Sequence, residues 1–312
     1  MSKYLVTGGA GFIGSNLVEK LILRGDSVVI VDNLSMGKIE NINCFPEKYV
    51  SFYKEDITNY SFMEQLLISE KFDYIVLLGA VASVADSVQN PQRTHIINQE
   101  ANVNIYEIIR KNKLKIKKLL FASSAAVYGD EPTLPKSEDS IIKPLTPYAI
   151  DKFASERYAL TYGKLYDIPT IATRFFNVYG PKQNPESPYS GVLSIIKNKL
   201  KNDEVFTMYG DGEQTRDFTY IDDVIEAILI LLHNTDIKWD VYNVATGKAI
   251  SLNEIIKIFE KISNKNLKIR YEQERKGDIK KSQADITKIR ENVGFNPRFS
   301  LELGLKKYYS KN

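Results

Sequence analysis

Two side chains in the middle of the chain, Tyr148 and Lys152, have the types and the spacing that proton transfer at a hydroxyl group requires. They are four positions apart, so on a helix they lie on the same face. An ammonium group beside a phenol lowers the pKa of the phenol, which makes it a base near neutral pH. Ser124 precedes this pair and completes a candidate constellation for a hydride-transfer enzyme.

A glycine-rich turn near the start of the chain is the second chemical signal. Gly9, Gly11 and Gly14 satisfy the G-x-G-x-x-G spacing, and Gly8, Gly11 and Gly14 satisfy the variant with a glycine at every third position. The turn follows an apolar strand-like run and opens an amphipathic stretch, so its amides can face a pyrophosphate at the positive end of a helix. A plain tight turn is the alternative interpretation of the same glycines.

Asp32 stands 18 positions after Gly14, at the end of the next strand-like run. A carboxylate at this spacing accepts hydrogen bonds from a ribose diol and repels a 2′-phosphate, which predicts NAD rather than NADP. Asp56 follows a further short run and is a candidate contact for the adenine. In the alternative interpretation, Asp32 only caps a loop.

Short apolar runs alternate with amphipathic stretches through the first half of the chain, as in a parallel sheet flanked by helices. The strands are expected at Tyr4–Thr7, Val28–Val31, Tyr74–Leu78, Leu119–Ser123 and Thr170–Arg174. The helices are expected near Phe12–Arg24, Ser61–Ser69, Thr94–Lys111 and Tyr148–Tyr166. The predicted fold is α/β: a doubly wound parallel-sheet Rossmann domain with a smaller α/β C-terminal substrate domain.

The pattern changes after residue 174, where prolines and glycines interrupt the alternation. We expect residues 1–174 to form the NAD-binding Rossmann domain and residues 175–312 to form a second domain, which binds the substrate. An apolar-faced helix over Asp222–His233 indicates that residues 216–243 rejoin the first domain.

Composition excludes several other classes of protein. The 42 basic and 39 acidic residues of the 312 leave a net charge of only +3, and the basic run from Lys111 to Lys118 is most simply a solvated surface, so we expect no nucleic-acid partner. The single cysteine, Cys44, excludes an internal disulfide, and two distant histidines do not suggest a metal site. No leader or membrane-length apolar run is evident, and we expect a cytoplasmic protein without a membrane partner.

Further motifs, taken with these, resemble the extended short-chain dehydrogenase/reductase family, in particular its nucleotide-sugar 4-epimerase branch. The likeness covers nearly the whole chain, and the order and joint presence of the motifs make it specific. They are TGGAGFIG at 7–14, DNL at 32–34, SSAAVYG at 123–129, YAIDK at 148–152, RFFNVYGP at 174–181, GDGEQTRDF at 210–218 and RKGDIKKSQAD at 275–285.

The resemblance implies a role for each residue of the constellation. Lys152 would hold the nicotinamide ribose and lower the pKa of Tyr148, and Tyr148 would take the proton from the sugar O4. Ser124 would hydrogen-bond that oxygen and position the proton. The full set of cofactor contacts would be Gly8, Gly11, Phe12, Ile13, Gly14, Asp32, Asn33, Asp56, Ile57, Leu78, Gly79, Ala80, Asn98, Ser123, Tyr148, Lys152 and Phe176.

The resemblance also implies the substrate contacts. Asn177, Arg216 and Arg275 would grip a diphosphate, because arginine pairs with phosphate oxygens at two points. Asp278 would reach the uridine ribose. The full set would be Ala82, Ser83, Ser124, Tyr148, Asn177, Val192, Thr207, Tyr209, Arg216, Arg275, Asp278 and Ser282. In the alternative interpretation, Arg216 only forms a surface ion pair with a neighbouring aspartate.

The residues after Ser124 select a reaction within the family. Relatives that eliminate water or decarboxylate place an acid there, whereas this chain has Ala125 and Ala126, which favours simple epimerisation. Ser282 occupies a position beside the sugar C2 substituent, where a bulky tyrosine would crowd an N-acetyl group. We therefore expect interconversion of UDP-GlcNAc and UDP-GalNAc, together with UDP-Glc and UDP-Gal.

Three alternatives stay open at this stage. A UDP-uronate 4-epimerase or another nucleotide-sugar-modifying relative would keep most of the motifs. An NAD(H)-sensing regulatory protein would keep the fold and usually lose the tyrosine and lysine, and an NADPH reductase is opposed by Asp32. The resemblance also implies a homodimer, formed through the helices over Thr94–Lys111 and Tyr148–Tyr166 as a four-helix bundle.

Overall fold

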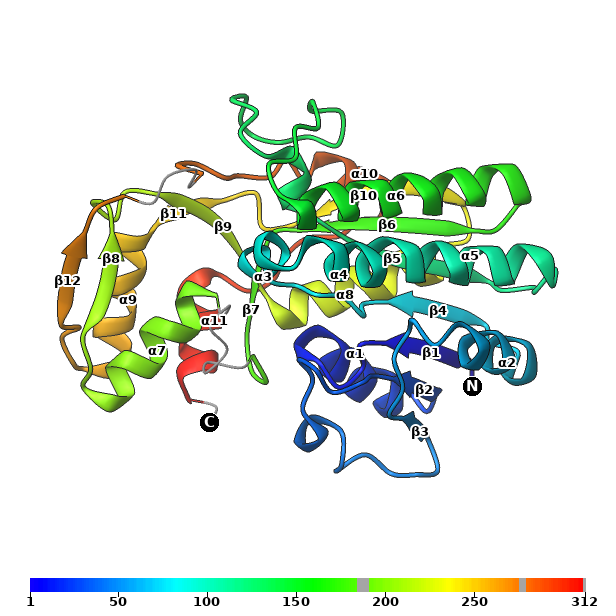
Figure 1. The fold of residues 1–312 in the computed structure, drawn as a ribbon. Helices are drawn as coiled ribbons and strands as arrows, with labels where there is room; N and C mark the ends of the chain where they lie inside the picture. Colours follow the sequence, from blue (N-terminus) through cyan, green and yellow to red (C-terminus); the bar gives the residue numbers. More distant parts are fainter. Residues whose placement is uncertain (184–190, 275–278, 311–312) are drawn as a thin grey trace.

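A seven-stranded parallel sheet forms the larger part of the molecule (Figure 1). The computed structural model describes residues 1–183, 191–274 and 279–310. The sheet has the strand order β10-β6-β5-β4-β1-β2-β3. The strands are β1 (Lys3–Thr7), β2 (Ser27–Val31), β3 (Val50–Tyr53), β4 (Tyr74–Leu77), β5 (Lys118–Ser124), β6 (Thr170–Phe175) and β10 (Trp239–Val244).

Strand β1 explains why both faces of the sheet are covered. Its residues alternate between two buried clusters: Tyr4 and Val6 belong to one, and Leu5 belongs to the other. A parallel strand with apolar residues on both faces needs helices on both sides. The helices on the first side are α1 (Phe12–Leu23) and α8 (Ile221–His233), and those on the second are α2 (Tyr60–Glu70), α5 (Ala101–Lys111) and α6 (Pro147–Tyr166).

Short helical segments connect these elements. They are α3 (Val84–Gln89), α4 (Pro91–His95), a π-helical turn (Ile96–Glu100), and the 3₁₀ turns Ile39–Asn41 and Ala125–Tyr128. In addition, α10 (Thr287–Val293) contacts β10. The predicted helix Thr94–Lys111 is therefore wrong in its start and its regularity. Pro91 begins the helical run, as proline does at a first helical position, and the π-helical turn separates α4 from α5.

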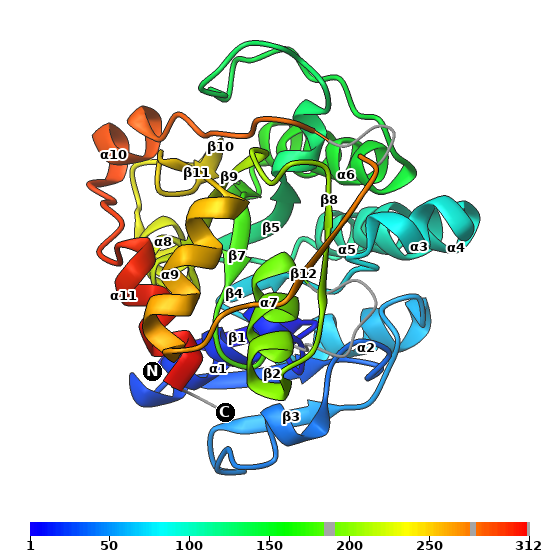
Figure 2. The same ribbon diagram turned by 90° about the vertical axis from the view of Figure 1, so that its left-hand side faces the viewer.

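The smaller unit lies at the end of the sheet where α7, α9, β8 and β12 gather (Figures 1 and 2). It holds a three-stranded sheet of order β11-β9-β7 and a parallel pair β12-β8. Its strands are β7 (Asn177–Tyr179), β8 (Phe206–Tyr209), β9 (Thr215–Tyr220), β11 (Ala249–Ser251) and β12 (Ile269–Glu272), and its helices are α7 (Val192–Asn202), α9 (Leu252–Ser263) and α11 (Leu301–Ser310).

The predicted fold class is confirmed, because the structure has a parallel sheet with helices on both faces and a smaller α/β unit. The segment 216–243 contributes β9 to the smaller unit and then α8 and β10 to the larger one. Strand β10 pairs in parallel with β6 along its whole length. The chain therefore crosses between the two units more than once.

Candidate functional site

A cavity of about 430 Å³ lies at the carboxyl ends of the central strands. It adjoins β1 and β4, where the strand order reverses direction, which is the position where open α/β sheets bind ligands. It is lined by every predicted cofactor residue except Asn98. Sixteen side chains or backbone segments that are dispersed in the sequence thus face one space.

The glycine-rich turn forms one wall of this cavity, and the close approach of neighbouring chain segments requires its glycines. Gly8 has φ +70°, and a Cβ there would lie 2.8 Å from the backbone nitrogen of Gly79. A Cβ at Gly14 would overlap the carbonyl oxygen of Gly8. Gly11 is the N-cap of α1 and no side chain caps that end, so the first amides of the helix face the cavity and suit an anion.

Asp32 caps a loop and lines the cavity at the same time, so its two interpretations are compatible. One carboxylate oxygen accepts from the backbone of Ala10 at 3.0 Å, and the other accepts from Leu34 at 2.8 Å. Burial raises the pKa of Asp32, and backbone hydrogen bonds oppose that rise. Each carboxylate oxygen has a second lone pair, so Asp32 can hold the glycine turn and still accept from a ribose.

The structure brings Ser124, Tyr148 and Lys152 together on the wall of the same cavity. Ser124 ends β5, and Tyr148 lies in the first turn of α6, after Thr146 caps the helix by accepting from the Ala149 amide at 3.3 Å. Ser124 hydrogen-bonds the Tyr148 side chain. The Lys152 ammonium donates to the Ala122 carbonyl at 2.8 Å.

The pKa values of the pair differ from the simplest expectation. Burial raises the pKa of Tyr148, and the hydrogen bond from Ser124 opposes the rise. Burial lowers the pKa of Lys152 to about 8, while the charge of Asp151 acts to raise it. The Lys152 ammonium lies 6.0 Å from the centre of the Tyr148 ring and its hydrogen bond goes to a carbonyl. In the protein alone, burial therefore dominates the pKa of Tyr148, and its lowering by Lys152 together with the cationic ring of NAD stays a prediction.

Two predicted residues lie off the cavities and hold the loop after β4. Asn98 accepts from the Val81 amide at 2.8 Å and donates to the Val81 carbonyl at 3.0 Å. Ser83 caps α3 by accepting from Asp86 at 2.9 Å. Both side chains are buried. Asn98 and Ser83 thus support a wall to which Val81 and Ala82 belong, and their predicted direct contacts with ligands stay predictions.

A second cavity, of about 880 Å³, lies in the smaller unit. It is lined by five of the predicted substrate residues, namely Asn177, Val192, Thr207, Tyr209 and Arg216. The sequence reasoning missed its further cationic residues Lys199, Lys268 and Arg270. Strand β12 carries Arg270 beside Thr207 of β8, with 3.2 Å between their polar atoms. No local sequence pattern predicts that two strands so far apart in the chain pair with each other.

The predicted substrate residues Ser282, Arg275 and Asp278 are not among the described residues that line the second cavity. Ser282 lines neither cavity, and its amide donates to the Thr215 carbonyl at 3.1 Å, next to Arg216. Arg275 and Asp278 lie outside the described residues. The first cavity has further lining residues that were not predicted: Ser35, Met36, Gly37 and Lys38 after Asp32, and Lys182 and Gln183 after β7. The position of the first four, directly after the predicted ribose-binding acid, was the available signal.

Within the described ranges, no group of three or more histidine, cysteine, aspartate or glutamate side chains is arranged to hold a metal ion. Across the same part of the chain, none of the helices combines the length and apolarity that a bilayer crossing requires.

A doubly wound sheet with a glycine turn, an acid after the second strand and a serine–tyrosine–lysine constellation defines a dinucleotide-binding protein of the short-chain dehydrogenase/reductase class. The chain belongs to the family described as GDP-mannose 4,6 dehydratase, whose family model matches residues 5–308. The resemblance to the extended short-chain dehydrogenases and their 4-epimerase branch is confirmed by this match and by the relatives.

Three relatives show the likeness over nearly the whole chain. A putative UDP-glucose 4-epimerase of Methanocaldococcus jannaschii is 38% identical over 304 residues, which cover 97% of this chain and 96% of the relative. The UDP-N-acetylglucosamine 4-epimerase of Methanobrevibacter ruminantium, solved with UDP-N-acetylmuramic acid, is 36% identical, with TM-score 0.93 and coverage of 99% and 97%. The UDP-glucose 4-epimerase of Thermus thermophilus, solved with NAD, is 32% identical, with TM-score 0.89 and coverage of 98% and 97%.

Proposed function

We propose that the chain is an NAD-dependent UDP-sugar 4-epimerase. The observation that carries the proposal is the gathering of Ser124, Tyr148 and Lys152 on the wall that also holds the glycine turn and Asp32. A regulatory protein that senses NAD(H) would need the turn and the acid but not the three reactive side chains. Their joint presence in one cavity favours an enzyme.

The residues of the first cavity fit NAD. The uncapped first turn of α1 suits the pyrophosphate, and Asp32 suits the adenosine ribose while disfavouring a 2′-phosphate. Asn33 donates to Asp56 at 2.5 Å, which orients that carboxylate at the adenine end. Bound NAD would supply the hydride acceptor and donor at the sugar C4, and its cationic ring would favour the phenolate of Tyr148.

Residues of the chain itself transfer the proton. Tyr148 takes the proton from the sugar O4 and returns it, and Ser124, already bonded to Tyr148, orients that oxygen. Lys152 holds the nicotinamide ribose from the next turn of α6, and in the protein alone its ammonium already faces the strand end through the Ala122 carbonyl. The walls around the trio keep water away from a 4-ketose while it turns over.

The second cavity suits the nucleotide half of the substrate. Arg216 and Asn177 line it together with Arg270 and two lysines. Lys199 and Lys268 pair with the acidic lining residues Glu204 and Asp203, so the excess of positive charge beside β8 comes from the two arginines. Arginine binds a diphosphate at two points, and the hydroxyl of Thr207 and the ring of Tyr209 offer polar and stacking contacts to a nucleoside. These residues support a diphosphate site in the smaller unit.

Within this class we propose UDP-GlcNAc and UDP-GalNAc as substrates, together with UDP-Glc and UDP-Gal. The resemblance to the family assigns Ser282 to the position beside the sugar C2 substituent, where a small side chain leaves room, and Ser282 is partly buried in the structure. The turn after Ser124, Ala125–Tyr128, presents no acid for elimination, which supports simple inversion at C4. A UDP-uronate is the second substrate class that the test below includes.

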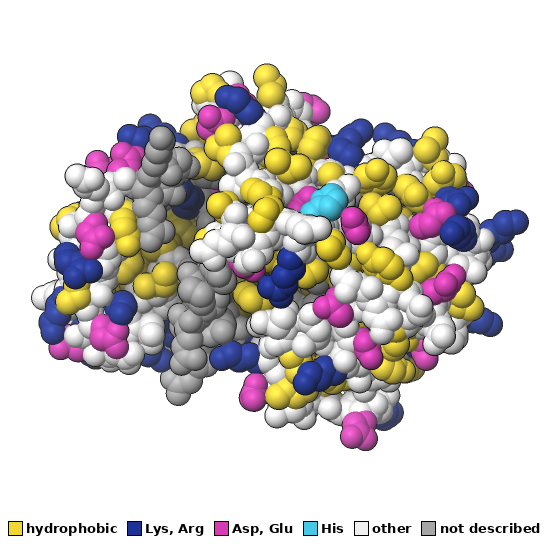
Figure 3. All heavy atoms as spheres, in the orientation of Figure 1, with side chains coloured by type: hydrophobic (Ala, Val, Ile, Leu, Met, Phe, Trp, Pro, Cys, Tyr) yellow, Lys and Arg dark blue, Asp and Glu magenta, His cyan; other side chains and the backbone are white. Residues whose placement is uncertain are grey.

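We also propose a homodimer through α5 and α6. Ile150, Tyr158 and Leu165 of α6 expose 52%, 43% and 68% of their surface, and their spacing places them along one side of the helix. Figure 3 shows hydrophobic side chains gathered over this part of the molecule. Light scattering on the eluted protein should give twice the chain mass of 35.5 kDa. A mass of one chain would refute the dimer.

The direct test of the function uses purified protein without added NAD. Separate incubations with UDP-Glc, UDP-GlcNAc and UDP-GlcNAcA, followed by chromatographic separation of the C4 epimers, report the reaction and the substrate together. Heat-released NAD, measured in the same preparation, reports cofactor retention. We expect epimers of the first two sugars. Turnover of the uronate alone would refute the substrate proposal, and no epimer from any sugar would refute the function.

A further inference from the structure

The segment that carries Ser282 is attached at two points. On one side, Thr215 bonds it twice: the Thr215 amide donates to Lys280 at 2.9 Å, and the Ser282 amide donates to Thr215 at 3.1 Å. On the other side, the Lys136 amide donates to Gln283 at 2.8 Å, and Asp285 donates to Lys136 at 2.7 Å. Ser282 therefore lies between an anchor next to Arg216 and an anchor on the loop that follows Ser124.

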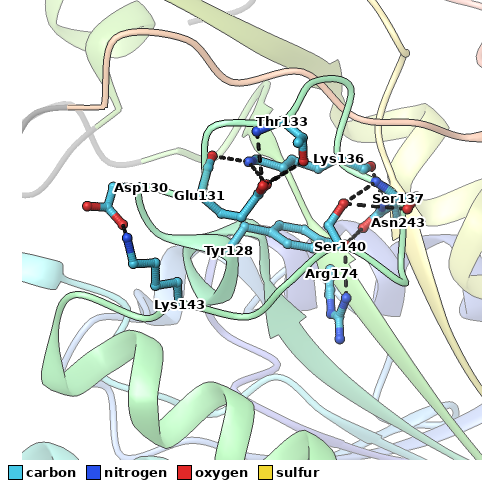
Figure 4. A network of polar contacts seen from close by, with 10 residues as sticks. All are labelled: Tyr128, Asp130, Glu131, Thr133, Lys136, Ser137, Ser140, Lys143, Arg174 and Asn243. Atoms are coloured by element: carbon cyan, nitrogen blue, oxygen red, sulfur yellow. Dashed lines mark hydrogen bonds and ion pairs between the residues drawn. The ribbon is translucent and has the colours of Figure 1, made fainter.

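The second anchor depends on one buried side chain, Asn243 of β10. Its amide nitrogen donates to the carbonyls of Lys136 at 2.8 Å and Asp285 at 3.2 Å, and its oxygen accepts from the Tyr128 hydroxyl at 2.7 Å. Figure 4 shows Asn243 among the residues of this loop. Asn243 has no exposed surface, so each of these bonds replaces a bond to water.

Tyr128 continues the connection toward the reactive residues. Its hydroxyl accepts from Arg174 at 2.9 Å, and burial raises its pKa to about 12, so it stays protonated and donates to Asn243. Arg174 forms a two-point ion pair with Glu156 at 2.6 and 3.0 Å, both side chains being buried. Glu156 also accepts from the Ser123 hydroxyl at 2.7 Å.

Glu156 and Ser123 are direct neighbours of the proposed catalytic groups. Glu156 follows Lys152 by one turn of α6, and Ser123 precedes Ser124 on β5. An unbroken series of hydrogen bonds thus runs from the back of the reactive trio to residue 285, and no bond in it involves a residue of the nucleotide-binding cavity of the smaller unit. Removing the Tyr128 hydroxyl takes away the hydrogen bond that the buried Asn243 side-chain oxygen accepts, whereas Arg174 keeps its bonds to Glu156 and to the Glu138 carbonyl. The loss of that bond loosens the connection at Asn243.

We propose that Tyr128 and Asn243 are positioning residues that set the place of the sugar. They fix the distance between the reacting pair, Ser124 and Tyr148, and the segment that carries Ser282, whereas the nucleotide is held independently by the anchor at Thr215. The proposal rests on the proposed function, because it assumes that a nucleotide-linked sugar lies between these two walls.

Tyr128→Phe tests the proposal, because it removes the hydroxyl and keeps the ring. Tyr242→Phe is the matched control: Tyr242 is the neighbour of Asn243 on β10, is equally buried, and its hydroxyl bonds Asn292 at 3.0 Å outside the network. Calorimetry gives the affinity of each protein for UDP and for the UDP-sugars, kinetics give KM and kcat, and heat-released NAD gives cofactor content. Asn243→Ser is a second variant, which removes the amide at the centre.

We expect Tyr128→Phe to weaken binding of the UDP-sugar and to raise its KM by about threefold to tenfold, the effect of one buried hydrogen bond. Binding of UDP alone and NAD content should match those of the parent, and Tyr242→Phe should change neither ligand. Equal losses for UDP and the UDP-sugar, an unchanged UDP-sugar affinity, or equal effects of both tyrosine variants would overturn the proposal. A parent protein that converts no UDP-sugar would instead refute the proposed function.

Discussion

The two cavities of this molecule differ in how their walls are built. Four strand ends contribute to the first cavity: Gly8 follows β1, Asp32 follows β2, Leu78 follows β4 and Ser124 ends β5. The second cavity takes its walls from the neighbours α7 and β8, from β9, and from β12, which joins them through its distant pairing with β8. A parallel sheet thus brings the predicted cofactor residues together, because its strands end at the same edge. The predicted substrate residues depend instead on tertiary contacts between elements of the smaller unit.

The largest expected effect is on chemistry in the first cavity. Tyr148→Phe removes the group that exchanges the proton with O4, so kcat should fall by about 10²- to 10⁴-fold. UDP binding, which we assign to the second cavity, should be unchanged. Tyr60→Phe, at an exposed position of α2 that lines neither cavity, is the control. Full turnover by Tyr148→Phe would show that another group is the base.

The second expected effect concerns the close approach of the glycine turn. Gly14→Ala places a methyl group against the Gly8 carbonyl, which must move and open the pyrophosphate wall. Retained NAD should fall below about one tenth of the parent value, as in overpacked sites. Gly25→Asn is the matched control, because it also replaces a glycine, at φ +81°, but in open space. Equal NAD content in Gly14→Ala and the parent would contradict the assigned wall.

The third effect compares the two sides of the sugar. Ser282→Tyr fills the space assigned to the C2 substituent, so kcat/KM for UDP-GlcNAc should fall about tenfold relative to UDP-Glc, the penalty of an overfilled site. Ser300→Tyr, in the loop before α11, supplies the same change away from both cavities. An equal loss on both sugars would show that Ser282 does not face C2.

The smallest effect is a change in pH dependence. The pKa of Lys152 is about 8, below its ordinary value, so its charge is present at lower pH and is lost as the pH rises through 8. If the charged form supports Tyr148, kcat should drop about threefold between about pH 7.5 and about pH 8.5. Lys152→Arg keeps its charge and should be slower, with no drop in that range. An identical drop in both proteins would assign it to another group.

The same contrast explains what could be predicted from the sequence. The fold class follows from the alternating pattern of the sequence, and about half of the residues that line the first cavity were predicted from the motifs and the resemblance to the family. Asn98 and Ser83 hydrogen-bond the backbone of the loop after β4, an arrangement that the sequence did not predict, and their direct ligand contacts stay predictions. Lys268 and Arg270 were missed because strand pairing between β8 and β12 leaves no local pattern.

The pKa of Tyr148 depends on side-chain orientation, which the sequence does not predict. Spacing correctly predicts that Tyr148 and Lys152 share a cavity, but it does not give the direction in which each side chain points. Lys152 donates to Ala122, and burial then determines the pKa values of both groups. The direction of the Lys152 side chain is set by its hydrogen bond to the carbonyl at the strand end, and the helical spacing alone does not predict that bond.

The central claim is that hydrogen leaves C4 of a UDP-sugar and returns to the same carbon inside the first cavity. The most direct measurement incubates UDP-glucose or UDP-N-acetylglucosamine, deuterated at C4, with the purified protein and no added NAD. Mass spectrometry and NMR of the product should show a C4 epimer of unchanged mass that keeps its deuterium at C4. Loss of water, transfer of the label to another carbon, or a dependence on added NAD(H) would contradict the account.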